Sequence, residues 1–134
     1  MTKLTTIEGV GKDYAQTLQD AGITTTEVLL DKAATPNGRA AIAEATGISE
    51  KLILKWANRV DLFRIKGIGE EYADLLEASG VDTVPDLARR NPANLHEKLA
   101  TVNAEKKLVR RVPTLTAVEA WVADAKELPR KLTY

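Results

Sequence analysis

The sequence predicts an all-α protein built from two similar helical units, and three observations lead to that prediction. Apolar residues recur every three or four positions, the spacing of helices that bury one face. The alternating β-branched pattern of strands is missing. Residues 7–15 also match residues 65–73, 58 positions later. A half of this length folding alone would bury only about 60% of the surface that its unfolded chain exposes, so we expect units at 1–62 and 63–134 packed around one core.

The first predicted helix of each half lies between two glycines. These helices span about residues 11–21 and 69–79. Gly22 and Gly80 follow them, at the position where a left-handed C-cap ends a helix. We therefore expect a positive φ at both glycines.

Short helices are predicted next in both halves. Thr25 and Thr83 are suited to be their N-caps, because a threonine hydroxyl accepts a hydrogen bond from an amide of the first turn. Asn37-Gly38 and Asn91-Pro92 are then expected to break the chain.

The last helix of each half carries an apolar stripe and a tryptophan. Ser49 is the expected cap of the first, and Thr116 with Glu119 forms a predicted capping box for the second. Trp56 and Trp121 stand on these stripes, so we expect both to be buried, the alternative being platforms on which nucleic-acid bases stack. The tryptophans are 65 positions apart, so the second half carries seven more residues, which we place near 106–112.

Composition narrows the class of protein. The chain has 134 residues, no cysteine, and 19 basic against 19 acidic side chains. The missing cysteines remove disulfides and thiolate chemistry, and the balanced charge argues against a protein that coats nucleic acid through bulk electrostatics. With no membrane-spanning apolar run and no signal peptide, we expect a cytoplasmic protein.

Catalysis is not expected. The chain has one histidine, His96, with no second imidazole at a metal-ligand spacing, and it lacks a P-loop or a dinucleotide fingerprint. We therefore predict neither an enzyme nor a cofactor, metal or small-molecule substrate.

The segment around Gly9-Val10-Gly11 and its counterpart Gly67-Ile68-Gly69 carry the pattern hydrophobic-x-Gly-hydrophobic-Gly. This pattern resembles the helix-hairpin-helix of DNA ligases and repair polymerases. With the lead Asp61-Leu62-Phe63-Arg64 and the two tryptophans, nearly the whole chain is similar to a prokaryotic family of uncharacterised tandem helix-hairpin-helix proteins. The resemblance implies a bundle like SAM domains or the N-terminal domain of DNA polymerase β.

The resemblance also implies a mode of binding. In DNA-binding members, backbone amides of the hairpin hold phosphates without reading bases. Carried over, the donors would be Gly9, Val10, Gly11 and Lys12, and in the second hairpin Gly67, Ile68, Gly69 and Glu70. The alternative is that these glycines only permit a tight turn.

The two hairpins differ in charge. The first has Lys12 where a phosphate would want a cation, whereas the second has Glu70 and Glu71 at the start of its helix. Arg64 and Lys66 flank the second hairpin on its other side.

The densest basic patch lies in the additional residues of the second half. It consists of Lys106, Lys107, Arg110 and Arg111. Spacings of four would place 106 with 110, and 107 with 111, on one face of a helix. Such a run is either a binding surface or a solvated face.

Two functions remain open. The first is sequence-independent binding of DNA or structured nucleic acid through the hairpins and the basic face. The second is a protein-interaction adaptor, which the balanced charge and the acidic second hairpin favour.

Overall fold

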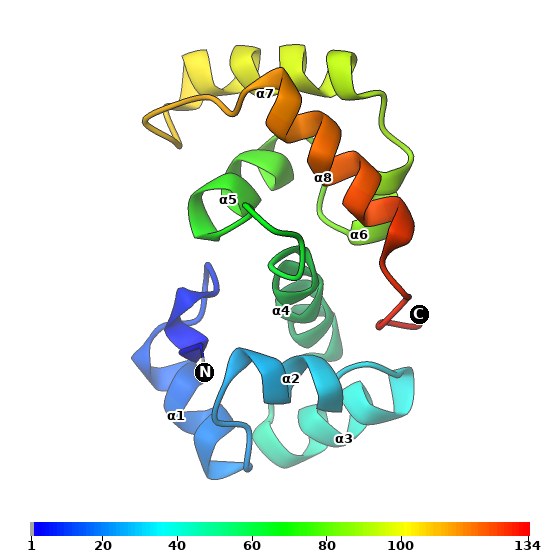
Figure 1. Cartoon of the computed structure of the whole chain (residues 1–134). Coiled ribbons are helices and arrows are strands. Elements are labelled where there is room, and N and C mark those ends of the chain that lie inside the picture. Colours follow the sequence, from blue (N-terminus) through cyan, green and yellow to red (C-terminus); the bar gives the residue numbers. More distant parts are fainter. Residues whose placement is uncertain (1) are drawn as a thin grey trace. The chain divides into compact units, whose positions relative to one another are not determined.

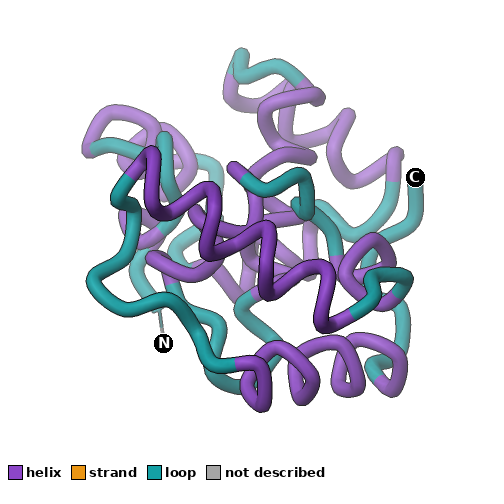
Figure 2. Tube along the Cα trace, turned by 90° about the horizontal axis from the view of Figure 1, so that it is seen from above, coloured by secondary structure: helices purple, strands orange, loops and turns teal. Residues whose placement is uncertain are grey.

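The computed structural model describes residues 2–134 (Figure 1). All regular secondary structure in that range is helical, and Figure 2 shows helices joined by loops without a strand. The elements are η1 (Leu4–Thr6), α1 (Lys12–Asp20), α2 (Thr26–Lys32), α3 (Pro36–Thr46), α4 (Glu50–Leu62), α5 (Glu70–Ala78), α6 (Val84–Ala88), α7 (Pro92–Lys106) and α8 (Leu115–Glu127). The all-α class is confirmed. Over the same residues, no helix is both long and apolar enough to span a bilayer.

Most helices begin at a side chain that caps them. Within residues 2–134, six of the eight α-helices have an N-cap oxygen that accepts a hydrogen bond from an amide of the first turn. These caps are Thr25, Thr35, Ser49, Thr83, Asn91 and Thr114. The predictions at Thr25, Thr83 and Ser49 are confirmed, and the two exceptions are the glycine-led helices α1 and α5.

Two predicted boundaries are wrong. The last helix begins at Leu115, because the Thr114 hydroxyl accepts from the Ala117 amide at 3.1 Å, so Thr116 lies inside the helix. Asn37-Gly38 does not break the chain but lies in the first turn of α3. There the Gly38 amide donates to the Thr35 hydroxyl at 3.0 Å.

The glycines that end α1 and α5 are left-handed, as expected. Gly22 has φ 88° and Gly80 has φ 91°. The next amides, of Ile23 and Val81, reach back to helix carbonyls at 2.9 and 2.8 Å. These bonds satisfy carbonyl groups that a helix end leaves open.

The chain divides into two compact units. Unit 1 contains the described residues up to Asp61 together with Arg130–Tyr134, and unit 2 contains Leu62–Pro129. The buried hydrophobic side chains form two clusters, one in each unit, and the expectation of one shared core stays a prediction.

Each core is built on a tryptophan from the last helix of its half. Trp56 of α4 is 1% exposed and Trp121 of α8 is 3% exposed. In unit 1 the fully buried neighbours include Leu18, Ile23, Leu29 and Ile53, and in unit 2 they include Leu75, Leu76, Leu87 and Leu95. The tryptophans are therefore core residues and not platforms for stacking bases.

The last five residues, expected with the second half, belong to unit 1 instead. Leu132 is buried in the unit 1 core. The Thr133 amide donates to the Ala34 carbonyl at 2.8 Å. The buried Arg39 guanidinium donates to the carbonyls of Ala33 and Thr133, each at 2.8 Å. Hydrogen bonds therefore hold this segment against α3 and the turn before it.

Candidate nucleic-acid interface

The first glycine-containing turn, residues 7–12, is named hairpin 1. Its apolar residues Ile7 and Val10 are buried, which attaches the turn to the unit 1 core. The Ile7 amide donates to Leu4 O, and the Val10 amide donates to Ile7 O, each at 3.0 Å. Gly9 lies between them with φ 91°, a conformation that glycine adopts without strain.

The second turn, residues 65–70, is named hairpin 2 and has the same local geometry within unit 2. The Ile65 amide donates to Leu62 O and the Ile68 amide to Ile65 O, each at 3.1 Å. Gly67 has φ 94°. What differs is the element that precedes each turn: hairpin 1 follows the three-residue η1, and hairpin 2 follows the long helix α4.

These bonds correct the expected set of phosphate donors. The amides of Val10 and Ile68 already donate to carbonyl oxygens inside their own hairpins. They are therefore unavailable to a ligand, because each N–H supplies one donor. Among the described residues, no hydrogen bond engages the amides of Gly11 and Lys12, or those of Gly69 and Glu70.

Gly11 and Gly69 are the N-caps of α1 and α5. Gly11 has φ −86° and ψ −171°, and Gly69 has φ −106° and ψ −162°, so both are extended and any residue could adopt their backbone. A Cβ added to either would meet no atom within 4 Å. Neither the backbone conformation nor crowding inside the protein therefore requires glycine at these positions.

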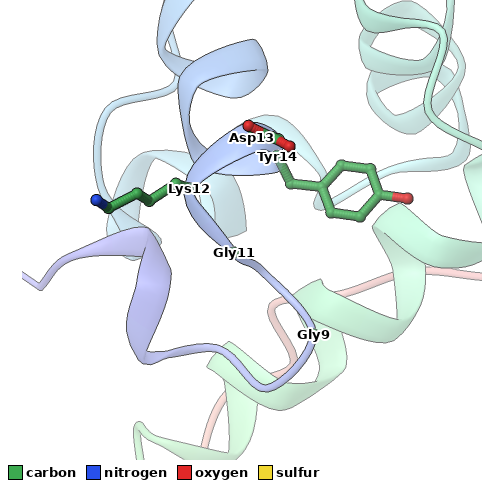
Figure 3. Close-up of a pocket in the computed structure, with 5 residues that line it drawn as sticks. All are labelled: Gly9, Gly11, Lys12, Asp13 and Tyr14. Atoms are coloured by element: carbon green, nitrogen blue, oxygen red, sulfur yellow. The ribbon is translucent and has the colours of Figure 1, made fainter.

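An open hollow of about 480 Å³ lies beside hairpin 1. It is lined by Gly9, Gly11, Lys12, Asp13 and Tyr14. Figure 3 shows Lys12 and Tyr14 extending in opposite directions from the start of α1, with Gly9 and Gly11 on the turn that leads into the helix. The Tyr14 side chain is 41% exposed, and its ring meets Trp56 edge-on with centroids 5.0 Å apart.

Charge in the hollow is mixed, because Lys12 and Asp13 are adjacent and both exposed. The two hairpins carry the same charges in opposite order, Glu8 then Lys12 in hairpin 1 and Lys66 then Glu70 in hairpin 2, so it is the start of α5 that is more acidic than the start of α1. Glu70 and Glu71 occupy the first turn of α5, both exposed, while Lys66 is the exposed cation before it. An anion at the helix start would therefore meet less repulsion at α1 than at α5.

The predicted basic helix face is wrong. Helix α7 ends at Lys106, and Lys107 takes the left-handed conformation with φ 51°. Arg110 and Arg111 follow in the loop that leads to α8. The helix stops here because Val109 turns inward to become buried. All four basic side chains are nevertheless exposed.

Two residues of the candidate site were not anticipated from the sequence. Tyr14 reads as an ordinary helix residue, yet it lines the hollow. Asn103 lies near the end of α7, and its side chain holds the backbone of Val109. An aromatic residue three positions after the second glycine is a local signal for Tyr14. No local signal marks Asn103.

Across residues 2–134, no group of three histidine, cysteine, aspartate or glutamate side chains is placed to hold a metal ion.

The comparisons with known proteins identify a family without a known role. The family described as Domain of unknown function (DUF4332) matches residues 8–128. No solved structure matches the chain. Because the match covers most of the sequence, the chain belongs to this family.

Proposed function

We propose that this member of the DUF4332 family is a non-catalytic module that binds the phosphate backbone of DNA or structured nucleic acid without reading its sequence. In this proposal hairpins 1 and 2 are helix-hairpin-helix motifs that arose by duplication. Hairpin 1 is the stronger contact, and the basic residues Lys106, Lys107, Arg110 and Arg111 add electrostatic attraction.

The observation that carries the proposal is the pair of glycine N-caps, Gly11 and Gly69. Serine or asparagine would cap a helix slightly better than glycine, and the space and conformation at both positions would accept one. Six other helices of the described chain use such caps. A bare backbone is useful where an external oxygen must approach amides directly, which is what a phosphate does at a helix N-terminus.

Electrostatics supports hairpin 1 in particular. The start of α1 carries the positive end of its helix dipole and presents amides that no protein acceptor engages among the described residues. Lys12 adds a full charge at the same place. Phosphate contacts of this kind bind any sequence, and their strength falls with rising salt.

A protein-interaction adaptor is the second candidate, and hairpin 2 favours it. Glu70 and Glu71 are exposed at the start of α5 and repel phosphate. The chain has zero net charge, so no overall attraction draws it to nucleic acid. In this reading the glycines only shape the turns.

Fluorescence anisotropy on duplex, single-stranded and branched DNA over a series of salt concentrations tests the proposal. We expect saturable binding, with the logarithm of the binding constant falling linearly as the logarithm of the salt concentration rises; the gradient of that line is the salt slope. Lys12→Gln should reduce the salt slope by about one, and Lys106→Glu with Arg110→Glu should weaken binding to all sequences alike. Lys126→Gln is the control, because it removes a cation in the last turn of α8, outside the hairpins and the basic residues of the proposal.

The competing outcomes are distinct. Absence of binding to all three DNA forms at low salt contradicts the proposal. A protein partner recovered from native lysate equally with and without nuclease, together with that absence, supports the adaptor instead.

A further inference from the structure

The loop that follows α7 displays positive charge on a fixed frame. It is named the basic loop and comprises residues 106–111, at the yellow-to-orange turn between α7 and α8 in Figure 1. Its exposed cations are Lys106, Lys107, Arg110 and Arg111. Within the described chain, no ion pair engages any of these four. Leu108, between the two pairs, is 39% exposed.

Asn103 holds this loop from inside. Its side-chain amide donates to Val109 O at 3.1 Å, and its side-chain oxygen accepts from the Val109 amide at 2.9 Å. The Lys107 amide donates to Asn103 O at 2.8 Å. With Val109 only 7% exposed, the loop is anchored at its centre while its charged residues face solvent.

Tyr72 connects the loop to the helix that follows hairpin 2. It lies in the first turn of α5 and donates its hydroxyl hydrogen to Arg111 O at 3.2 Å. Its ring packs against Trp121 with centroids 5.2 Å apart. The arginine end of the basic loop is therefore tied beside hairpin 2 within the same unit.

Hairpin 2 has a carboxylate at its helix start, where hairpin 1 has a cation. At the 58-residue spacing of the matching segments, Lys12 corresponds to Glu70. A carboxylate at this place weakens anion binding. Unit 2, which has a carboxylate at this place, also contains the four cations of the basic loop.

We infer that the basic loop replaces hairpin 2 as the phosphate-contacting element of unit 2, and that Asn103 and Tyr72 are the positioning residues that hold Arg110 and Arg111 in place for it. This inference rests on the proposed function. Unit 1 then contacts phosphate through hairpin amides, whereas unit 2 contacts it through arginine side chains, which bind phosphate oxygens in a two-pronged geometry.

The test is a double-mutant cycle on duplex DNA that uses the full chain. Arg110→Gln with Arg111→Gln should reduce the salt slope by about two. Tyr72→Phe keeps the ring and removes the hydroxyl, and it should weaken binding by about two- to tenfold, the range that one hydrogen bond supports. Asn103→Ala should weaken it at least as much. In the background that lacks both arginines, neither variant should have a further effect.

Tyr134→Phe is the matched control, because it removes a hydroxyl bonded to Asn58 in unit 1 and should leave binding unchanged. Circular dichroism and thermal unfolding establish that each variant is folded. The inference is overturned if Tyr72→Phe and Asn103→Ala leave wild-type binding intact, or weaken it equally with and without the arginines. If the unmodified chain binds no DNA, both the inference and the proposed function are wrong. If the unmodified chain binds DNA and the loop variants bind it equally well, only the inference is wrong.

Discussion

The indole nitrogen of Trp121 lies 3.0 Å from the position that a Cβ on Gly67 would occupy, so the backbone of hairpin 2 rests directly on the tryptophan. In unit 1 the equivalent distance, from Trp56 Nε1 to a Cβ on Gly9, is 3.7 Å. Each hairpin is thus supported by the tryptophan of its own unit. The two supports differ in how much room they leave.

This difference predicts unequal effects of alanine at the two glycines. Both residues have positive φ, so Gly9→Ala should destabilise the protein by about 1–2 kcal/mol through backbone strain. Gly67→Ala should destabilise it more, because the new methyl group also presses on Trp121. Urea unfolding followed by circular dichroism measures both. Equal losses would show that the closer contact has no energetic consequence.

Trp56 and Trp121 are predicted to be the costliest residues to truncate. Replacing either with alanine should lower the free energy of unfolding by about 3–5 kcal/mol, because each is almost fully buried and leaves a large cavity. Lys106→Ala, at an exposed position, should change it by less than about 0.5 kcal/mol. A tryptophan truncation as mild as the lysine change would contradict the core assignment.

Leu132 should matter for stability although only two described residues follow it. Its side chain is 1% exposed in the unit 1 core, so Leu132→Ala should cost about 2–5 kcal/mol. Leu108→Ala removes the same atoms from an exposed position and is the control. Thermal unfolding of both variants checks the prediction, and similar small shifts would mean that the segment is not part of the core.

Low pH should lower the free energy of unfolding, partly through protonation of Glu27. Hydrogen bonding lowers the pKa of its carboxyl group to about 2, from an ordinary value of 4.5; its own backbone amide contributes most, and Thr2 and Thr26 add to it. A lowered folded-state pKa stabilises the fold above pH 4.5, and this contribution is lost as the pH falls toward 2. Glu27→Gln should therefore lose less stability than the wild type between pH 4.5 and 2. Melting temperatures at pH 5, 3 and 2 test this, and parallel curves would contradict it.

Local signals in the sequence were sufficient for much of the fold. Thr25 and Thr83 are N-caps because each hydroxyl accepts a hydrogen bond from the backbone amide three residues later, so the signal is local. Gly22 and Gly80 end their helices for an equally local reason, the positive φ that favours glycine.

Other features depend on contacts that no local pattern records. The charge spacing at Lys106–Arg111 suited a helix, but Asn103 and the burial of Val109 turn the chain out of helical geometry. The placement of Leu132 in unit 1 depends on Arg39 and Ala34, about 95 residues earlier. Of the candidate site, the glycines follow from the pattern, whereas the engaged amide of Val10 becomes evident only once the turn is folded.

Gly11→Ser tests the central claim most directly, because serine supplies both a cap and a Cβ at the start of α1. The serine hydroxyl should engage a first-turn amide and leave stability within a few tenths of a kcal/mol of the wild type. Its side chain should also fill the approach to the amides, so DNA affinity at fixed salt should fall about tenfold or more. Ser49→Gly, which removes the cap of α4, should leave affinity unchanged. Unaltered DNA affinity in a folded Gly11→Ser protein would contradict phosphate binding at hairpin 1.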